Sequence, residues 1–136
     1  QGVYENSTQS RMQLMGEFLT NLHYELDGNL AWFLITQYMV ERAQASKADV
    51  EGFSDLVRTI QGVEVSLMIF EQNKTSCRIN FRSKGNYSVN NIAKSLGGRG
   101  YAFAAGAVIE GSLHQVQFKA VNASINSIRK QMSKFA

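Results

Sequence analysis

The sequence has no proline, only one cysteine, and no apolar run long enough to cross a membrane. Without proline, glycine and the Asn and Asp residues must mark the turns. The single Cys77 excludes an internal disulfide and favours a reducing compartment, so we expect a cytoplasmic protein. The longest apolar run, Leu30 to Ile35, predicts a buried strand and not a membrane span.

Motifs for catalysis or metal binding are also missing. His23 and His114 lie far apart, and neither has an acidic or cysteine neighbour at ligand spacing. The patterns HExxH, CxxC and GxSxG do not occur. Cys77 falls on the apolar face of a predicted strand, which is more typical of a core residue than of a nucleophile. We therefore expect no catalytic and no metal-ligating residues in this chain.

The length and composition predict one globular domain. The chain has 136 residues, of which 44% are hydrophobic and 18% are charged. Its net charge of +3 suits a polyanionic ligand, but many ordinary domains are equally basic. The first residues carry no signal-peptide pattern and no initiator Met, so we expect a processed chain or a part of a longer one.

Apolar periodicity predicts helices that alternate with about five strands. The first helix is expected to place Met12, Met15, Leu19 and Leu22 at helical spacing, with Leu14 and Phe18 alongside, and to stand apart as a connector. We expect a mixed α/β fold, in which helices flank a mixed sheet. The predicted helices cover residues 7–23, 37–45, 53–60, 88–96 and the segment after Ser112, and the main predicted strands cover 30–35, 63–70, 75–83 and 105–110.

The predicted strand 75–83 alternates between two faces. Cys77, Ile79 and Phe81 share one face, and Arg78, Asn80 and Arg82 share the other. Arg82, at the end of this strand, is suited either to a bidentate contact with phosphate or to plain exposure to solvent.

The stretch GGRGYAFAAG, residues 97–106, is unusually rich in glycine. Glycines permit positive φ and close approach of a ligand, and successive N–H groups in such a turn form an anion-binding nest. The alternative is a glycine cap at the end of a helix followed by a tight connection. Tyr101 and Phe103 are suited either to stacking on a base or to packing in the core.

Taken in order, these pieces resemble the C-terminal DHH-associated domain of DHH-family phosphoesterases. In that family, an Arg-Ser pair ends a strand, and a helix, a glycine-rich loop and Ala-Ala-Gly follow. The subgroup that it resembles most contains soluble bacterial enzymes that degrade very short RNAs and dephosphorylate 3′-phosphoadenosine 5′-phosphate (pAp). The matching segments are Arg82-Ser83, Ile92-Ala93-Lys94, residues 97–101 and Ala104-Ala105-Gly106, together with residues 60–72 and 4–19 upstream.

The resemblance implies that residues 1–24 form a linker helix from an N-terminal DHH domain and that residues 25–136 form a substrate-binding domain. In such an enzyme, manganese and the catalytic motifs belong to the N-terminal domain, so this chain would be part of a hydrolase and would bind short RNA or nucleotide phosphates. The residues that the resemblance assigns to substrate are Arg82, Ser83, Gly97, Gly98, Arg99, Gly100 and Tyr101.

Two residues of the loop depart from the family pattern, which is usually Gly-Gly-Gly-Gly-His. Arg99 replaces a glycine and Tyr101 replaces the histidine. Tyrosine is neutral at pH 7 and donates one hydrogen bond. Arg99 could restore the positive charge, although its β-carbon would penalise a left-handed conformation.

Three other functions remain open. One is a non-catalytic nucleic-acid module, similar to the C-terminal domain of alanyl-tRNA synthetases. Another is the same domain from a cyclic-dinucleotide phosphodiesterase of the family. The third is a structural domain with an inactive loop, which would serve packing or the formation of a homodimer.

Overall fold

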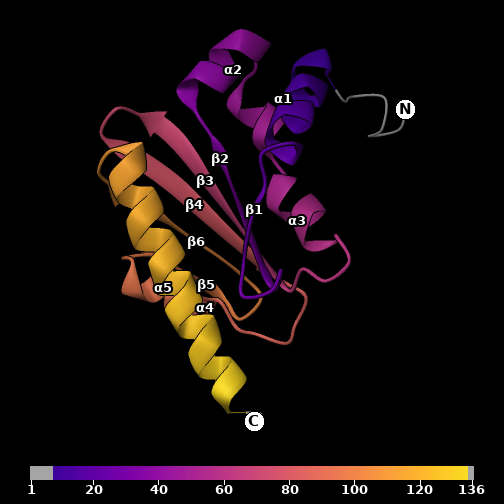
Figure 1. Cartoon of the computed structure of the whole chain (residues 1–136). Helices are drawn as coiled ribbons and strands as arrows, with labels where there is room; N and C mark the ends of the chain where they lie inside the picture. Colours follow the sequence, from indigo (N-terminus) through magenta and orange to yellow (C-terminus); the bar gives the residue numbers. More distant parts are fainter. Residues whose placement is uncertain (1–7, 135–136) are drawn as a thin grey trace.

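Six strands form one mixed sheet with helices packed on both of its faces (Figure 1). The computed structural model describes residues 8–134. In chain order the elements are α1 (Gln9–Leu19), β1 (His23–Glu25), β2 (Leu30–Ile35), α2 (Gln37–Ala43), the 3-10 helix η2 (Lys47–Val50), α3 (Phe53–Arg58), β3 (Val65–Asn73), β4 (Ser76–Ser83), α4 (Asn90–Ser95), β5 (Arg99–Tyr101), β6 (Ala104–Glu110) and α5 (Leu113–Ser133).

The strand order across the sheet is β1-β2-β3-β4-β6-β5. Only β2 and β3 pair in parallel, because α2, η2 and α3 provide the long crossover that a parallel pair needs. The predicted mixed α/β fold is confirmed, with six strands where about five were expected. One unpredicted element is β5, a three-residue strand inside the glycine-rich stretch.

One face of the sheet packs against α4 and α5. Its core contains the inward side of β4 (Cys77, Ile79 and Phe81), as the alternation predicted. Ser112 begins α5 as predicted, since its hydroxyl accepts a hydrogen bond from the N–H of Gln115 in a capping box.

The opposite face packs against α1, α2 and α3, which cover β2 and β3. Phe18 of α1 stacks on Phe33 of β2 with ring centroids 4.4 Å apart. Of the apolar residues expected along this helix, Leu14 and Phe18 are buried and Met15 packs partly against the core, whereas Met12 remains 56% exposed and does not face inward. The helix does not stand apart from the domain.

The role of residues 1–24 as a linker stays a prediction, and residues 1–7 of that segment lie outside the described residues. None of the helices within residues 8–134 is both long enough and apolar enough to span a membrane.

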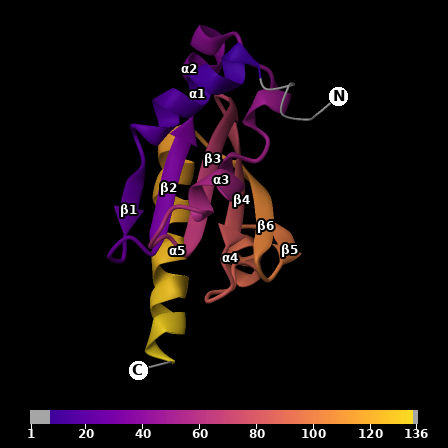
Figure 2. The ribbon, with the colours of Figure 1, turned by 90° about the vertical axis from the view of Figure 1, so that its right-hand side faces the viewer.

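The helices α1 to α3 leave β6, β5 and the part of β4 away from α3 open on their side of the sheet (Figure 2). Val108 on β6 is 56% exposed and Tyr101 on β5 is 82% exposed. Half of this face of the sheet is therefore available to a ligand or to another domain.

Candidate functional site

The open part of the sheet carries polar residues in register on β4 and β5. Antiparallel pairing places Gly106 of β6 opposite Asn80 of β4 and opposite Arg99 of β5. Val108 is likewise opposite Arg78. Because directly opposed residues point to the same face, these side chains border one hollow above Gly106. The hollow has a volume of about 440 Å³.

A second hollow adjoins the first, one row further along the strands. Here Ala104 of β6 lies opposite Arg82 of β4 and opposite Tyr101 of β5. This hollow also has a volume of about 440 Å³, and Asp55 and Phe103 border it. We call the two hollows together the open-face groove, which is formed by Arg78, Asn80, Arg82, Arg99, Tyr101, Ala104 and Gly106.

The floor of the open-face groove carries little bulk because Ala104 has only a methyl group and Gly106 has no side chain. A β-carbon on Gly106 would lie 2.8 Å from the carbonyl oxygen of Ile79 and 2.9 Å from Oδ1 of Asn80. A larger residue there would push β6 away from β4 or fill the groove. The floor therefore leaves room for a planar group between the walls on β4 and β5.

Asp55 of α3 holds two arginines at one end of the groove. Its Oδ1 lies 3.3 Å from Nε of Arg82 and 3.3 Å from Nη2 of Arg58. Arg82 also donates a hydrogen bond of 2.8 Å to the carbonyl of Phe81. The side chains of Arg82 and Asp55 are 29% and 46% exposed, so solvent reaches this ion pair.

Arg78 and Arg99 add positive charge to the two walls. Among the described residues, neither takes part in a salt bridge. The Arg78 guanidinium lies 5.8 Å from the centre of the Phe70 ring, and its Nε is buried without a hydrogen-bond partner within residues 8–134. Arg99 is exposed on the edge strand β5. The groove is thus basic on both sides.

Ser83 is buried and supports the turn after β4. Its hydroxyl donates to the carbonyl of Tyr87 at 2.5 Å and accepts from the N–H of Gly85 at 3.1 Å. Ser83 borders the second hollow, but both bonds of its hydroxyl lie within the turn, so the hydroxyl is already engaged. A direct contact of Ser83 with phosphate stays a prediction.

Gly97 and Gly98 end α4 through a glycine cap. Gly97 has a φ of +87°, its N–H donates to the carbonyl of Lys94, and the N–H of Gly98 donates to the carbonyl of Ala93. This pair of bonds is the Schellman motif. Since both N–H groups have protein partners, they form no anion-binding nest here, and the helix-cap interpretation holds for these two residues.

The glycines also let β5 approach β6. A β-carbon built on Gly98 would collide with the carbonyl oxygen of Gly106, and one on Gly100 would collide with Ala105. Arg99 lies between these glycines without a positive φ, so the strain expected from its β-carbon does not arise. A role of the glycines in letting phosphate approach stays a prediction.

Tyr101 and Phe103 are exposed by 82% and 48% of their surface, which excludes the core alternative for Tyr101.

Asp55 and Arg58 were not predicted as site residues, because α3 reaches the end of β4 only through the tertiary fold. Asn80 and Arg78 were recognisable from their alternation with Arg82, which places all three on one face.

Cys77 is fully buried, and burial together with the charge of Glu71 raises the pKa of its thiol to about 11. The prediction that it is a core residue is confirmed. Within residues 8–134, no three His, Cys, Asp or Glu residues are grouped so that they could hold a metal ion.

Comparisons with known proteins identify a family and several relatives of this chain. A family model described as the DHHA1 domain matches residues 33–131. The bifunctional oligoribonuclease and PAP phosphatase NrnA of Thermus thermophilus is 33% identical over 102 residues, which are 75% of this chain and 30% of that protein.

Solved structures show the same fold. An exopolyphosphatase-related protein from Bacteroides fragilis matches 94% of this chain and 36% of its own, with a TM-score of 0.80 and 28% identity. A pGpG-specific phosphodiesterase, PggH from Vibrio cholerae, matches 94% of this chain and 40% of its own, with a TM-score of 0.58 and 11% identity. The chain thus spans about a third of the length of these relatives.

Proposed function

The chain belongs to the DHHA1 domain family, and from this premise we propose that it is the substrate-binding domain of a DHH-family phosphoesterase. The family match confirms the resemblance predicted from residues 81–109. In this proposal the open-face groove holds the phosphate and the base of a short RNA or of a nucleotide such as pAp.

The observation that carries the proposal is the basic groove on a sheet face that the helices leave open. Arg78 and Arg82 form one wall and Arg99 forms the other, with Gly106 and Ala104 between them. Guanidinium groups bind phosphate oxygens through two parallel hydrogen bonds. A phosphate between these walls would meet positive charge from both sides.

The exposed rings at one end suit a base. Tyr101 and Phe103 border the hollow next to Arg82, and both rings are open to solvent. Aromatic side chains stack on any base with about 1–3 kcal/mol per base. We propose that Tyr101 stacks or donates to the ligand and that Arg99 supplies the charge, so that the pair replaces the histidine of the family loop.

Catalysis would need parts that the described residues do not supply. No group of potential ligands within residues 8–134 fits a metal ion, so we assign no metal-dependent step to this chain. We propose that manganese and the attacking water are held by an N-terminal DHH domain. The task of this chain is then to bind the substrate and to orient its phosphate.

A titration of the chain with pAp and with a diribonucleotide tests the proposal. Arg82→Ala and Arg99→Ala should each weaken binding about tenfold or more, since a hydrogen bond to a charged group contributes about 1.5–3 kcal/mol. Arg42→Ala, in α2, where Arg42 pairs with Glu17 and does not line the groove, is the matched control and should bind as the wild type does. A Tyr101→His variant should retain or strengthen binding.

Two results would count against the proposal. One is the absence of saturable binding to both ligands by the wild type and by Tyr101→His. The other is equal binding by the Arg82→Ala, Arg99→Ala and Arg42→Ala variants, which would leave the groove as a structural surface.

A further inference from the structure

The charges of the chain are segregated along the sequence. Residues 1–71 contain ten of the eleven acidic residues, whereas residues 72–136 contain ten of the fourteen basic ones. The only acidic residue after position 71 is Glu110. The second half of the chain is therefore strongly basic, although the whole protein is only mildly so.

Part of this positive charge lies on the face of the sheet opposite the open-face groove. The helices α4 and α5 cover that face (Figure 1). Neither helix contains an Asp or a Glu, and α5 carries Lys119, Arg129 and Lys130, with Lys134 at its end. With Lys94 of α4, this helix layer has five cations and no carboxylate, a distribution that attracts a polyanion.

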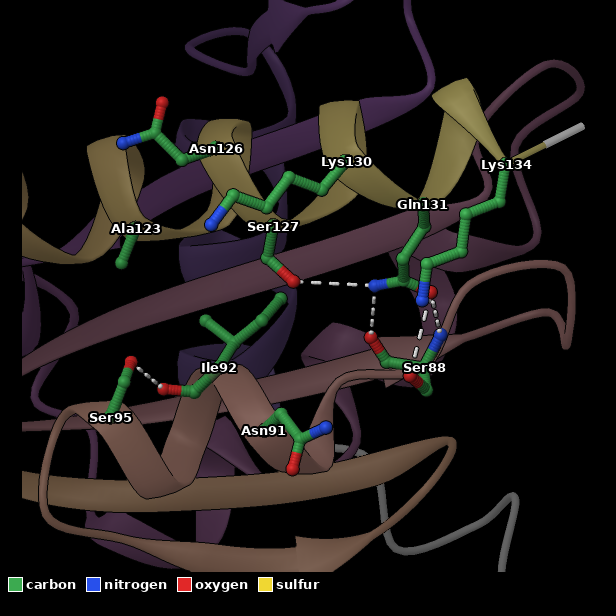
Figure 3. A pocket seen from close by; sticks show the side chains of 10 residues that line it. All are labelled: Ser88, Asn91, Ile92, Ser95, Ala123, Asn126, Ser127, Lys130, Gln131 and Lys134. Carbon is green, nitrogen blue, oxygen red and sulfur yellow. Dashed lines mark hydrogen bonds between the residues drawn. The ribbon is translucent and has the colours of Figure 1, made fainter. Parts of the chain in front are cut away.

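A polar cleft runs between α4 and α5, with a volume of about 450 Å³ (Figure 3). We call it the α4–α5 cleft. Ile92 and Ala123 are its apolar part. Its polar lining is formed by Asn91, Ser95, Asn126, Ser127, Lys130 and Lys134.

The α4–α5 cleft is held in shape by one side chain. Gln131 of α5 donates a hydrogen bond of 3.0 Å to the carbonyl of Ser88 and accepts one of 2.8 Å from the Ser88 N–H. These bonds tie α5 to the residues just before α4. A cleft that is already ordered loses little entropy when a ligand binds.

The lysines and the amides of the cleft remain available to a ligand. Lys130 and Lys134 extend along the cleft in Figure 3, and neither forms an ion pair with another described residue. Figure 3 also shows no hydrogen bond from Asn91 or Asn126 to the other cleft residues. Two cations and two amides thus border the cleft, whereas the Ser95 hydroxyl already donates to the carbonyl of Ile92 and the Ser127 hydroxyl accepts from Gln131.

We infer that the α4–α5 cleft binds the sugar–phosphate backbone of a single-stranded RNA. Lysines neutralise phosphates, and the amides of Asn and the hydroxyls of Ser contact phosphate oxygens and sugar hydroxyls. The small apolar part, Ile92 and Ala123, offers no pocket for the aromatic side chains that dominate protein interfaces. The chemistry of the cleft therefore fits a strand of nucleic acid better than an acidic protein.

This inference does not rest on the proposed function of the groove, because the two sites lie on opposite faces of the sheet. A single mononucleotide or dinucleotide molecule cannot fill both the groove and the cleft. The inference instead predicts that affinity rises with strand length.

Fluorescence anisotropy with a labelled RNA strand of about twelve nucleotides, at salt concentrations from about 50 to 200 mM, tests the inference. The double variant Lys130→Gln, Lys134→Gln should bind this RNA about 25-fold more weakly at about 0.1 M salt, with the salt slope reduced by about 1.4, because each phosphate contact on a single strand contributes about 0.7. Binding of pAp to the same variant should stay unchanged.

The matched control is Lys47→Gln, Lys74→Gln, which removes the same charge from exposed positions on η2 and on the β3–β4 turn. Equal losses of RNA binding in both double variants would overturn the inference, because they would show only a net-charge effect. Binding of inorganic polyphosphate as tightly as RNA would also overturn it. If the variant Lys130→Gln, Lys134→Gln lost pAp binding but kept RNA binding, that result would instead contradict the proposal for the groove.

Discussion

The carboxylate of Asp55 lies 3.3 Å from Nε of Arg82, at the end of the open-face groove. The same oxygen lies 3.3 Å from Arg58. Asp55 thus occupies the place beside Arg82 that a phosphate oxygen would take in the proposed complex. Because the pair is partly exposed, it contributes little to stability, so the carboxylate can leave when a stronger anion arrives.

The change Asp55→Asn should strengthen the binding of pAp. It removes a negative charge that competes with the phosphate, and an exposed ion pair contributes at most about 1 kcal/mol, which corresponds to about fivefold in affinity. Isothermal titration calorimetry measures the change. Asp27→Asn, in the turn between β1 and β2, is the control and should have no effect. Weaker binding by Asp55→Asn would show that the carboxylate positions Arg82 for the ligand.

The change Gly98→Ala should destabilise the edge of the sheet. Its β-carbon would collide with the carbonyl oxygen of Gly106, which is fixed by the pairing of β6 with β4. We expect a loss of about 2 kcal/mol or more in the free energy of unfolding, as for other overpacked sites.

The matched control for this change is Gly16→Ala. Gly16 lies within α1, and a β-carbon there would meet nothing within 4 Å. Alanine should therefore stabilise the protein by about 0.5–1 kcal/mol. Urea denaturation measures both variants, and equal effects of the two would contradict the close packing of β5 on β6.

The change Asp49→Asn should lower stability at neutral pH. Its carboxylate accepts hydrogen bonds from the Thr8 hydroxyl at 2.6 Å and from the Ser46 N–H at 2.9 Å. These bonds hold the pKa of Asp49 below its ordinary value of 3.8, and the hydrogen bond from Thr8 lowers it most. We expect a loss of about 1–2 kcal/mol on substitution.

The effect of Asp49 should depend on pH in a defined direction. A carboxylate with a lowered pKa in the folded state stabilises the protein above pH 3.8, and this contribution disappears as the pH falls below that value. Urea denaturation should show a large difference in the free energy of unfolding between Asp49→Asn and the wild type near neutral pH, and a small difference at about pH 2. A constant difference would mean that the charge of Asp49 does not matter.

The Cys77 thiol should not react in the folded protein. Burial, with a smaller effect of Glu71, raises its pKa to about 11, so thiolate is scarce at about pH 8. A thiol reagent should label it only as fast as the protein unfolds. Rapid labelling of the native protein would contradict the buried position.

The raised pKa of Cys77 also means that stability is lost as the pH rises from 9 towards 11, since the unfolded chain releases the proton first.

Local patterns in the sequence predicted much of the fold. The alternation in β4 placed Arg78, Asn80 and Arg82 on one face, because a strand repeats every two residues. Ser112 was recognised as the cap of α5 from its own chemistry. In these two elements the signal lies in neighbouring residues, and the expectation and the structure agree.

The remaining features depend on contacts between distant segments. The strand β5 has only three residues and exists because it pairs with β6, which no local pattern indicates. The buried face of α1 is set by the contact of Phe18 with Phe33. Asp55 meets Arg82 only after α3 packs beside β4. The acidic member of the groove therefore could not be identified from sequence.

The most direct test of the account is a titration of the isotope-labelled chain with pAp, followed by amide chemical shifts in NMR. The account predicts saturable shifts that concentrate in residues 78–82 and 99–106, the strands that form the open-face groove. It predicts no saturable shifts along α5. No saturable binding, or shifts confined to α4 and α5, would contradict the claim that the groove is the substrate-binding site.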